Sequence, residues 1–349
     1  MAGLPPIPGL RELAALAAKP VGLVNDLSNR PLVLRPMDLL RGAGSVQDAV
    51  RDRTILVTGA SSGIGEETAR QLGAAGGKVV IVARSLDKLQ ALATEIEAAG
   101  GTADPRSCDL SDFDAIDALM ESVLADHGTV DVLVNNAGRS IRRSVALSYD
   151  RFHDYERTMQ LNYFAAVRLI LRVLPGMREQ RGGHVVNISS AGVQTRTPRF
   201  GAYIASKAAL DTLCDALQAE TRDENVRFTT IHMPLVRTPM IAPTKMYERF
   251  PALTPEQAGG LVTRAIVHRP RRLGPPFGSA AAFIDTLSPD TMDLVRNRGF
   301  KMFPDTRAAR AVAAERSAED AAAAPGTDAD GNANTTGVAF ANLTRGTHW

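Results

Sequence analysis

The stretch TILVTGASSGIG, residues 54–65, decides the fold, because an apolar run leads directly into a glycine-rich turn. Gly59 permits a tight turn, Gly63 lets the backbone approach a phosphate group, and Gly65 permits close contact between a helix and a strand. A helical pattern follows at once, and the N-terminus of a helix offers free N–H groups and partial positive charge to a phosphate. The stretch therefore predicts the first strand, turn and helix of a dinucleotide-binding domain.

The same alternation of strand and helix continues over residues 51–275. Strand-like runs rich in β-branched residues recur at 54–60, 78–84, 130–138, 183–190 and 226–234. Helical periods separate them at 64–75, 86–99, 112–127, 151–180 and 203–222. Apolar strands alternating with helices form parallel sheets covered on both faces, and parallel crossovers are right-handed, so we expect an α/β fold with a doubly wound parallel sheet. A further helix is expected from Thr254, since Pro255 and Gln257 supply a helix-starting proline and a capping-box partner.

The two ends of the chain differ in composition from this central part. Residues 1–50 are expected to form a partly helical N-terminal extension, on which Leu10, Leu13 and Leu16 share one helical face. This extension is expected to pack on the protein itself, with a second subunit or a membrane surface as alternatives. Residues 276–304 predict a C-terminal surface helix. Residues 305–349 offer almost nothing to bury, so a disordered tail is expected.

Composition excludes several classes of protein. The chain has 349 residues, enough to bury a core, and its 40 Lys+Arg against 38 Asp+Glu leave too little net charge for a general nucleic-acid binder. Cys108 and Cys214 cannot build a disulfide framework and are expected as unpaired thiols in a reducing cytosol. No run of 18 apolar residues predicts a membrane span, and Arg11, Glu12 and Lys19 interrupt any secretory signal. A cytoplasmic location is expected, with peripheral membrane contact as an alternative, and no metal site is predicted.

The residues at the end of the strand-like run 78–84 indicate which nicotinamide cofactor binds. A cofactor with a free ribose 2′-hydroxyl usually meets an acidic residue after the second strand, but here Arg84 offers a cation to a 2′-phosphate. We therefore expect NADP(H) rather than NAD(H), the alternative being that Arg84 is a solvated surface residue. Asp109 ends the third strand and is expected near the adenine. The run Asn-Asn-Ala-Gly, residues 135–138, ends the fourth strand at the same edge.

Four further residues predict carbonyl chemistry. Tyr203 and Lys207 are four residues apart and so share one helical face. A phenol titrates near pH 10, but a neighbouring ammonium would lower that pKa and make Tyr203 a proton donor for a carbonyl oxygen that receives hydride. Ser190 closes the fifth strand and can hold the same oxygen. Asn162 lies in an apolar helix, where it could hold a water that feeds protons through Lys207.

Taken together, these motifs resemble the short-chain dehydrogenase/reductase family over residues 51–270. The resemblance implies a Rossmann sheet of about seven strands, with residues 51–275 as the domain, and hydride transfer. Tyr203 would be the acid/base, Ser190 the group that holds the carbonyl oxygen, Lys207 the residue that tunes Tyr203 and binds the nicotinamide ribose, and Asn162 a member of the proton relay. It also implies a homo-oligomer, a dimer or tetramer, that associates through the two long helices carrying Asn162 and Tyr203.

One departure from the family concerns the segment after the sixth strand. The family often has Pro-Gly there, whereas this chain has Pro234-Leu235, which puts the local turn in question. Pro234 and Thr238 can still line the nicotinamide side. The full set of expected cofactor-binding residues is Gly59, Ser61, Ser62, Gly63, Ile64, Gly65, Arg84, Asp109, Leu110, Asn136, Ala137, Gly138, Tyr203, Lys207, Pro234 and Thr238.

The loop over residues 235–255 carries the information on substrate. Its large side chains are Met240, Ile241, Met246, Tyr247 and Phe250. They suit an apolar, chain-like substrate, the alternative being that they only cover the sheet.

A basic cluster at Arg264 and 268–272 follows this loop. It could meet the phosphates of coenzyme A or be a solvated face.

The stretch from 234 to 272, together with FKMFPD at 300–305, resembles bacterial fatty acyl-CoA reductases of the same family. This resemblance implies NADPH-dependent reduction of a long-chain fatty acyl-CoA to the aldehyde. A ketone or alcohol oxidoreductase acting on a steroid, a lipid ketone or a 3-oxoacyl chain is the alternative, and a cofactor-binding module without turnover is the third.

Overall fold

A parallel sheet of seven strands forms the centre of the part of the chain described by this computed structural model, which covers residues 44–242, 244, 247–248, 250–305 and 311. The strands are β1 (Thr54–Thr58), β2 (Lys78–Ala83), β3 (Thr102–Ser107), β4 (Val132–Asn135), β5 (Gly183–Ser190), β6 (Val226–Met233) and β7 (Arg272–Leu273). Their order is β3-β2-β1-β4-β5-β6-β7, and every neighbouring pair is parallel. The sheet reverses its direction of growth between β1 and β4, so the predicted doubly wound α/β fold is confirmed.

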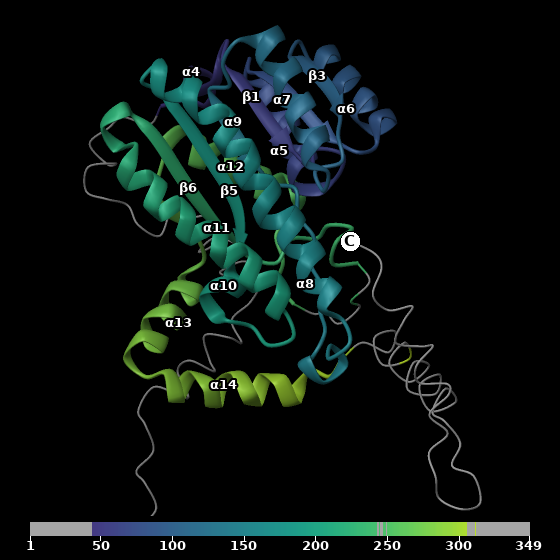
Figure 1. Cartoon of the computed structure of the whole chain (residues 1–349), viewed down its shortest axis with the longest axis vertical. Coiled ribbons are helices and arrows are strands. Elements are labelled where there is room, and N and C mark those ends of the chain that lie inside the picture. Colours follow the sequence, from purple (N-terminus) through teal and green to yellow (C-terminus); the bar gives the residue numbers. More distant parts are fainter. Residues whose placement is uncertain (1–43, 243, 245–246, 249, 306–310, 312–349) are drawn as a thin grey trace, which may run out of the picture.

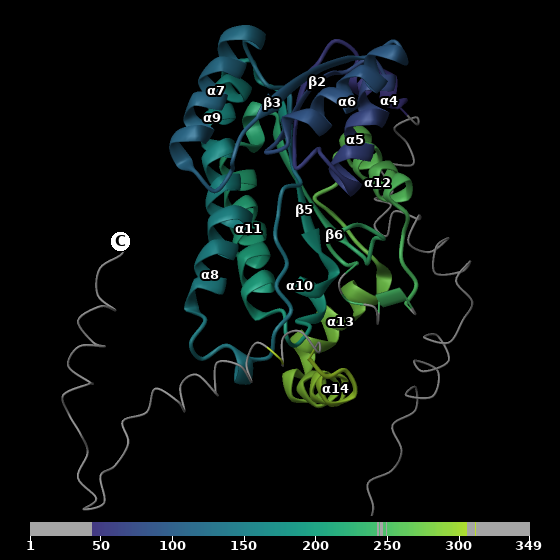
Figure 2. The same cartoon turned by 90° about the vertical axis from the view of Figure 1, so that its right-hand side faces the viewer.

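Helices cover both faces of this sheet. The α-helices are α4 (Val46–Val50), α5 (Gly63–Ala74), α6 (Leu86–Ala98), α7 (Phe113–His127), α8 (Phe152–Met159), α9 (Ala165–Glu179), α10 (Ala191–Thr195), α11 (Gly201–Glu220), α12 (Pro255–His268), α13 (Pro276–Leu287) and α14 (Pro289–Met302). Two short 3-10 turns lie at Val145–Leu147 and Arg222–Glu224. Figure 2 shows α7, α9 and α11 on one side of the sheet and α5, α6 and α12 on the other.

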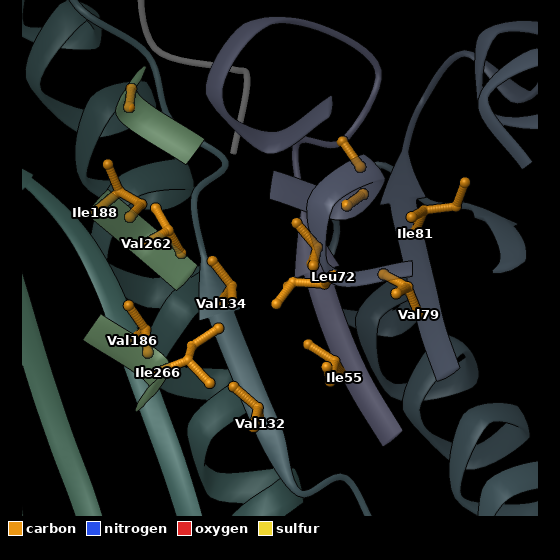
Figure 3. Packing of buried hydrophobic residues seen from close by; sticks show 14 of the residues in the cluster. Ile55, Leu72, Val79, Ile81, Val132, Val134, Val186, Ile188, Val262 and Ile266 are labelled. Carbon is orange, nitrogen blue, oxygen red and sulfur yellow. The ribbon is translucent and has the colours of Figure 1, made fainter. Parts of the chain in front are cut away.

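The core consists of two apolar layers, one on each face of the sheet. Successive strand residues point to opposite faces, so Ile55 and Val57 pack in one layer and Leu56 in the other. Figure 3 shows the first layer, where Leu72 of α5 and Val262 of α12 meet the strand residues. Each fully buried aliphatic side chain of this kind contributes about 1.5–3 kcal/mol, so the sheet is held rigidly where its carboxyl ends carry the site.

The predicted start of α12 is confirmed in detail. The Thr254 hydroxyl accepts a hydrogen bond from the backbone N–H of Gln257 at 3.2 Å, and the Gln257 side chain accepts one from the Thr254 N–H at 3.0 Å. Pro255 occupies the first helical turn, where its missing N–H costs nothing. This capping box can be predicted from sequence because all its partners lie within four residues.

The C-terminal region differs from the prediction of a single surface helix over 276–304. It forms two helices, α13 and α14, that meet at Ser288 and Pro289. Proline has no N–H to donate and disfavours the helical conformation in the residue before it, and Ser288 is accordingly extended, with φ −150° and ψ 81°. Figure 1 shows both helices beyond α10, which continues from the carboxyl end of β5.

Two predicted end segments lie largely outside the described residues. Of the N-terminal extension, only residues 44–50 are described, and there α4 packs against α12. The amphipathic helix around Leu10–Leu16 and the tail after Asp305 are not described, apart from Ala311. Within the described residues no helix is long and apolar enough to cross a membrane. Cytoplasmic location and peripheral membrane contact stay predictions.

Candidate active site

A cavity of about 1650 Å³ lies at the carboxyl edge of the sheet. It exceeds the usual size of a small-molecule site and has room for a dinucleotide together with a substrate. Sixteen of the predicted site residues line it: Gly59, Ser61, Ser62, Gly63, Ile64, Arg84, Asp109, Leu110, Asn136, Ala137, Gly138, Ser190, Tyr203, Lys207, Pro234 and Thr238. Two others, Gly65 and Asn162, lie behind the wall and support it.

The glycine-rich turn between β1 and α5 has the geometry that a phosphate needs. Gly59 and Gly63 adopt φ values of +65° and +62°, which side chains rarely allow, and a Cβ at Gly63 would lie 2.9 Å from Thr238 Cγ2. Ser62 precedes α5 without capping it through its side chain, so the first N–H groups of α5 are left for a ligand. The turn therefore fits the pyrophosphate of a dinucleotide.

Thr58, which the sequence analysis did not single out, joins this turn to the end of β4. Its hydroxyl accepts hydrogen bonds at 3.0 Å from the N–H groups of Asn136 and Ala137 and donates to Val134 O at 3.2 Å. The Asn136 side chain donates in turn to the carbonyl oxygens of Thr58 and Gly59. Gly65 packs directly under this junction, where a Cβ would collide with Gly59 and Asn136. The signal in the sequence that could have identified Thr58 is its place as a polar residue at the end of the first predicted strand.

Arg84 and Asp109 border the part of the cavity that follows β2 and β3. Arg84 is exposed, and among the described residues its guanidinium has no partner, so it is free to meet a phosphate. The backbone carbonyl of Arg84 is fixed by the Ser107 hydroxyl at 3.0 Å. Asp109 Oδ1 accepts a hydrogen bond from the Ser111 N–H at 2.9 Å and thereby shapes the loop after β3.

Tyr203 and Ser190 lie close together on the cavity wall. Ser190 ends β5, and its hydroxyl accepts a hydrogen bond from the Gly192 N–H at 3.0 Å. Burial raises the pKa of the Tyr203 phenol above its usual value, and the hydrogen bond with Ser190 opposes this rise only in part. The prediction that Lys207 lowers the pKa of Tyr203 is therefore wrong for the protein without a bound cofactor, because the effect of burial on the phenol is the largest one. At neutral pH Tyr203 is a protonated donor.

Lys207 lies one helical turn beyond Tyr203 and is buried. Burial lowers the pKa of its ammonium to about 8. Its position is shown by Gly138, since a Cβ there would lie 3.4 Å from Lys207 Nζ and 3.2 Å from Asn162 Oδ1. The two side chains therefore converge at the end of the Asn-Asn-Ala-Gly segment.

Asn162 lies in a turn of π-helix, Gln160–Phe164, that interrupts the predicted continuous helix over 151–180. Its amide nitrogen donates to Arg139 O and Ser206 Oγ, both at 2.9 Å, and its oxygen accepts from the Arg139 N–H at 2.7 Å. Both amide hydrogens are thus used by the protein, and only Oδ1 retains capacity to accept. Turns of this kind are common at functional sites, but hydrophobic periodicity does not predict them.

The other end of the cavity carries several large apolar side chains. Met240, Ile241 and Tyr247 from the predicted substrate loop line it, together with Phe200 and Phe277. Of the remaining loop residues, Phe250 stacks edge-on against Phe303, with ring centroids 5.7 Å apart, and Met246 lies outside the described residues.

Leu235, the departure from the family pattern, also lines the cavity. Its carbonyl accepts from the Leu253 N–H at 2.8 Å, and Leu253 O accepts from the Arg237 N–H at 2.9 Å. A short parallel bridge between Val236 and Leu253 thus fixes the segment without the glycine.

A strap formed by residues 303–305 borders this end of the cavity, where Pro304 and Asp305 line the wall. Arg142 donates to the carbonyl oxygens of Phe303 and Pro304, at 3.2 and 3.0 Å. Asp305 accepts from the Ser144 N–H at 3.0 Å and lies 3.2 Å from Arg199 Nε. The sequence analysis placed Asp305 at the start of a disordered tail, which is wrong, because these partners lie more than a hundred residues away and local composition does not reveal them.

The basic cluster expected near coenzyme A lies outside the cavity wall. Arg271 and Arg272 bind the carboxylate of Asp215, and Arg271 also donates to Phe228 O and Cys214 O. These residues fit the alternative better, namely that the cluster is a solvated face of the protein.

The model of the short-chain dehydrogenase family matches residues 53–248. The chain is also 53% identical to an oxidoreductase of Mycobacterium bovis over 97% of this chain and 99% of that protein. The chain belongs to the short-chain dehydrogenase/reductase family. This short-chain dehydrogenase is therefore an oxidoreductase, and the predicted family is confirmed.

Two further comparisons bear on what this short-chain dehydrogenase acts on. It is 49% identical to a fatty acyl-CoA reductase of Acinetobacter baylyi over 75% of this chain and 89% of that protein. A metagenomic short-chain oxidoreductase whose crystal structure contains NADP matches it with a TM-score of 0.56 and 32% identity, over 65% of this chain and 96% of that one.

Proposed function

We propose that this short-chain dehydrogenase is an NADPH-dependent reductase that converts a long-chain fatty acyl-CoA to the fatty aldehyde. The observation that carries the proposal is one continuous cavity that runs from the glycine-rich turn, past Tyr203 and Ser190, to the apolar wall around Met240. Such a cavity places a carbonyl group between a dinucleotide and an acyl chain. The likeness to the Acinetobacter baylyi fatty acyl-CoA reductase supports the same substrate.

The preference for NADPH rests on Arg84. It is an exposed cation on the cavity wall directly after β2, where a dinucleotide presents its adenosine ribose, and no acidic residue takes its place. The NADP in the crystal structure of the metagenomic oxidoreductase supports this preference. When bound, the cofactor supplies a hydride to the carbonyl carbon of the substrate.

The residues of the chain handle the oxygen and the protons. The hydroxyl groups of Ser190 and Tyr203 hold the thioester oxygen, and Tyr203 gives it a proton as the carbon is reduced, which forms a hemithioacetal. Its raised pKa suits this step, because the phenol carries its proton at neutral pH. Tyr203 then takes the proton back from the hydroxyl, the C–S bond breaks, and the thiolate leaves with the electron pair and is protonated by water. The products are an aldehyde and free coenzyme A.

The assay is incubation of the purified protein with palmitoyl-CoA and NADPH. We expect the aldehyde and the free thiol of coenzyme A to appear in equal amounts, at the rate at which NADPH is consumed. With a Tyr203→Phe variant both products should form at least about 100-fold more slowly. Consumption of NADPH without release of the thiol would contradict the proposal, since it would place the reduction on another carbonyl.

A second candidate is a ketone or alcohol oxidoreductase with the same chemistry, acting on a steroid, a lipid ketone or a 3-oxoacyl chain. The observation that favours it is that Arg271 and Arg272 bind Asp215 instead of lining the cavity, so this cluster offers no site for coenzyme A. A panel of ketones with NADPH discriminates the two, because only this candidate predicts turnover without a thioester.

We also propose that the chain forms a homo-oligomer through the helices that carry Asn162 and Tyr203. Tyr149, Phe152 and Leu171 before and along these helices are 83%, 71% and 59% exposed, which is unusual for large apolar side chains. Light scattering coupled to size-exclusion chromatography tests this, with Leu171→Glu expected to shift the mass toward the monomer.

A further inference from the structure

Helix α11 carries a third polar residue in line with Tyr203 and Lys207. Asp211 follows Lys207 by four residues, so all three side chains project from one face of the helix. That face packs against β5 and β6 (Figure 1), and the Asp211 side chain is buried, with only 7% of the residue exposed. This buried carboxylate has no role in the mechanism proposed above.

Two neighbouring strands hold Asp211 in place. Ser189 and His232 are paired in the register of β5 and β6. The Ser189 hydroxyl donates to Asp211 Oδ2 at 3.1 Å, and His232 Nε2 donates to the same oxygen at 2.9 Å. The second oxygen, Oδ1, is buried and has no hydrogen-bond partner among the described residues. A buried carboxylate satisfied on one side only requires a compensating positive charge nearby.

Lys207 is the buried cation that can supply this charge. Burial disfavours its ammonium, and Asp211 is the charged group that acts in the opposite direction. The two do not need a direct salt bridge, because Ser189 and His232 hold Oδ2 in place. The ammonium therefore stays at the cavity wall beside Gly138 and Asn162, while the carboxylate acts on it from one helical turn away.

The other charged groups packed around α11 have partners of their own. Asp215, one turn further along α11, is bound to Arg271 and Arg272. Asp154 on α8 is bound to Arg151 and Arg157. His184 on β5 is neutral, because burial lowers its pKa to about 3. His232 on β6 is a further titratable group, and its Nε2 contacts Asp211 rather than Lys207.

We propose that Asp211 is a positioning residue that keeps Lys207 in its ammonium form and so keeps the Tyr203–Lys207 pair competent at neutral pH. This inference rests on the proposed function and on the expectation that Lys207 binds the nicotinamide ribose beside Tyr203. Ser189 and His232 take part in the same arrangement. They fix the carboxylate of Asp211 at a position where its charge acts on Lys207 but does not draw the Lys207 ammonium away from Asn162. Among the described residues, no other carboxylate is available for this task.

The direct test measures the titration of Lys207 by NMR, with lysines labelled at Cε and the Lys207 signal assigned from a Lys207→Met variant. We expect a pKa of about 8 in the wild type. Asp211→Asn keeps the shape of the side chain and removes its charge, so the pKa should fall by about one unit or more. Asp215→Asn, one turn away on the same helix, is the matched control and should leave it unchanged.

Several outcomes would overturn the inference. An unchanged Lys207 pKa in folded Asp211→Asn is one, and an equal fall in Asp215→Asn is another. Because Asp211→Asn could fail to fold, the wild type is itself a test: Lys207 titrating below neutral pH would show that Asp211 does not keep it charged. Ser189→Ala keeps the charge and removes one hydrogen bond, so a small change is expected.

The pH profile of kcat provides a second readout that a merely structural role would not move. In Asp211→Asn the fall in kcat at high pH should begin about one pH unit lower than in the wild type, as the Lys207 pKa does. A Tyr203→Phe variant that keeps full activity would refute the proposed function. A Tyr203→Phe variant without activity, combined with an unmoved profile in Asp211→Asn, would refute only this inference.

Discussion

The two ends of the cavity are built in different ways. The cofactor end consists of the turns that directly follow β1, β2, β3 and β4, and Thr58 and Asn136 tie two of these turns together. The substrate end is assembled from the loop after β6, the start of α13 and the strap 303–305, which meet only in the folded chain. Changes at the cofactor end should therefore alter binding of the dinucleotide, and changes at the substrate end should alter KM for the acyl substrate.

The largest effect is expected at the boundary between the two ends. Tyr203→Phe removes the proton donor and should lower kcat by roughly 10²–10⁴-fold, the usual contribution of a general acid. NADPH affinity should stay nearly intact. Tyr247→Phe, at the apolar end of the same cavity, is the matched control and should change kcat little. A large loss of NADPH binding in Tyr203→Phe would show that the tyrosine serves the cofactor end instead.

The second effect concerns the phosphate that distinguishes the two nicotinamide cofactors. Arg84→Ala should raise the Kd for NADPH by roughly 10- to 100-fold, since it removes a charge-assisted contact, and leave the Kd for NADH nearly unchanged. Calorimetric titration measures both. Lys88→Ala, an exposed cation on α6, is the control. An unaltered preference for NADPH would remove Arg84 from the site.

A smaller effect is expected at Gly63, in the glycine-rich turn of the cofactor end, which lies against Thr238 of the loop after β6. Gly63→Ala places a Cβ in a left-handed backbone conformation and 2.9 Å from Thr238, and the strain of about 1–2 kcal/mol should weaken NADPH binding by roughly 5- to 30-fold. Gly260→Ala on α12, where nothing lies within 4 Å of the new Cβ, should bind NADPH normally and be slightly more stable. Equal binding by the two variants would contradict the role of the turn.

The smallest effect is expected at the strap. Asp305→Ala loses the hydrogen bond from Ser144 and the contact with Arg199, so KM for the acyl substrate should rise by roughly 3- to 10-fold while the Kd for NADPH stays the same.

The strap should also respond to acid. Burial raises the pKa of Asp305, but the hydrogen bond from Ser144 and the charge of Arg199 outweigh it and hold the pKa below its usual value. The stability that Asp305 contributes is therefore present at neutral pH and is lost only as the pH falls through that lowered value. Acid-induced opening well above pH 5 would contradict this assignment.

The comparison of the two ends also explains which features of the fold and the site could be predicted from the sequence. The turn at 59–65, the capping box at Thr254 and the Tyr203–Lys207 pair were predicted because each depends on residues within one or two turns of the chain. The contacts of Asp305 with Ser144 and of Asp211 with His232 were missed, because they join segments far apart in sequence. The π-turn at Asn162 was missed because one turn of five residues within a long helical stretch is too short for hydrophobic periodicity to detect.

Ser189 and Ser190 stand next to each other in β5 and both line the cavity, yet the Ser189 hydroxyl donates to Asp211 while the Ser190 hydroxyl accepts from the Gly192 N–H. A strand turns its side chains to opposite faces with a period of two. Inserting or deleting a single residue within β5 would therefore exchange the positions of the two hydroxyls. The composition of the core would hardly change, but the substrate carbonyl would lose the hydroxyl that holds it, and Asp211 would lose its hydrogen bond from β5.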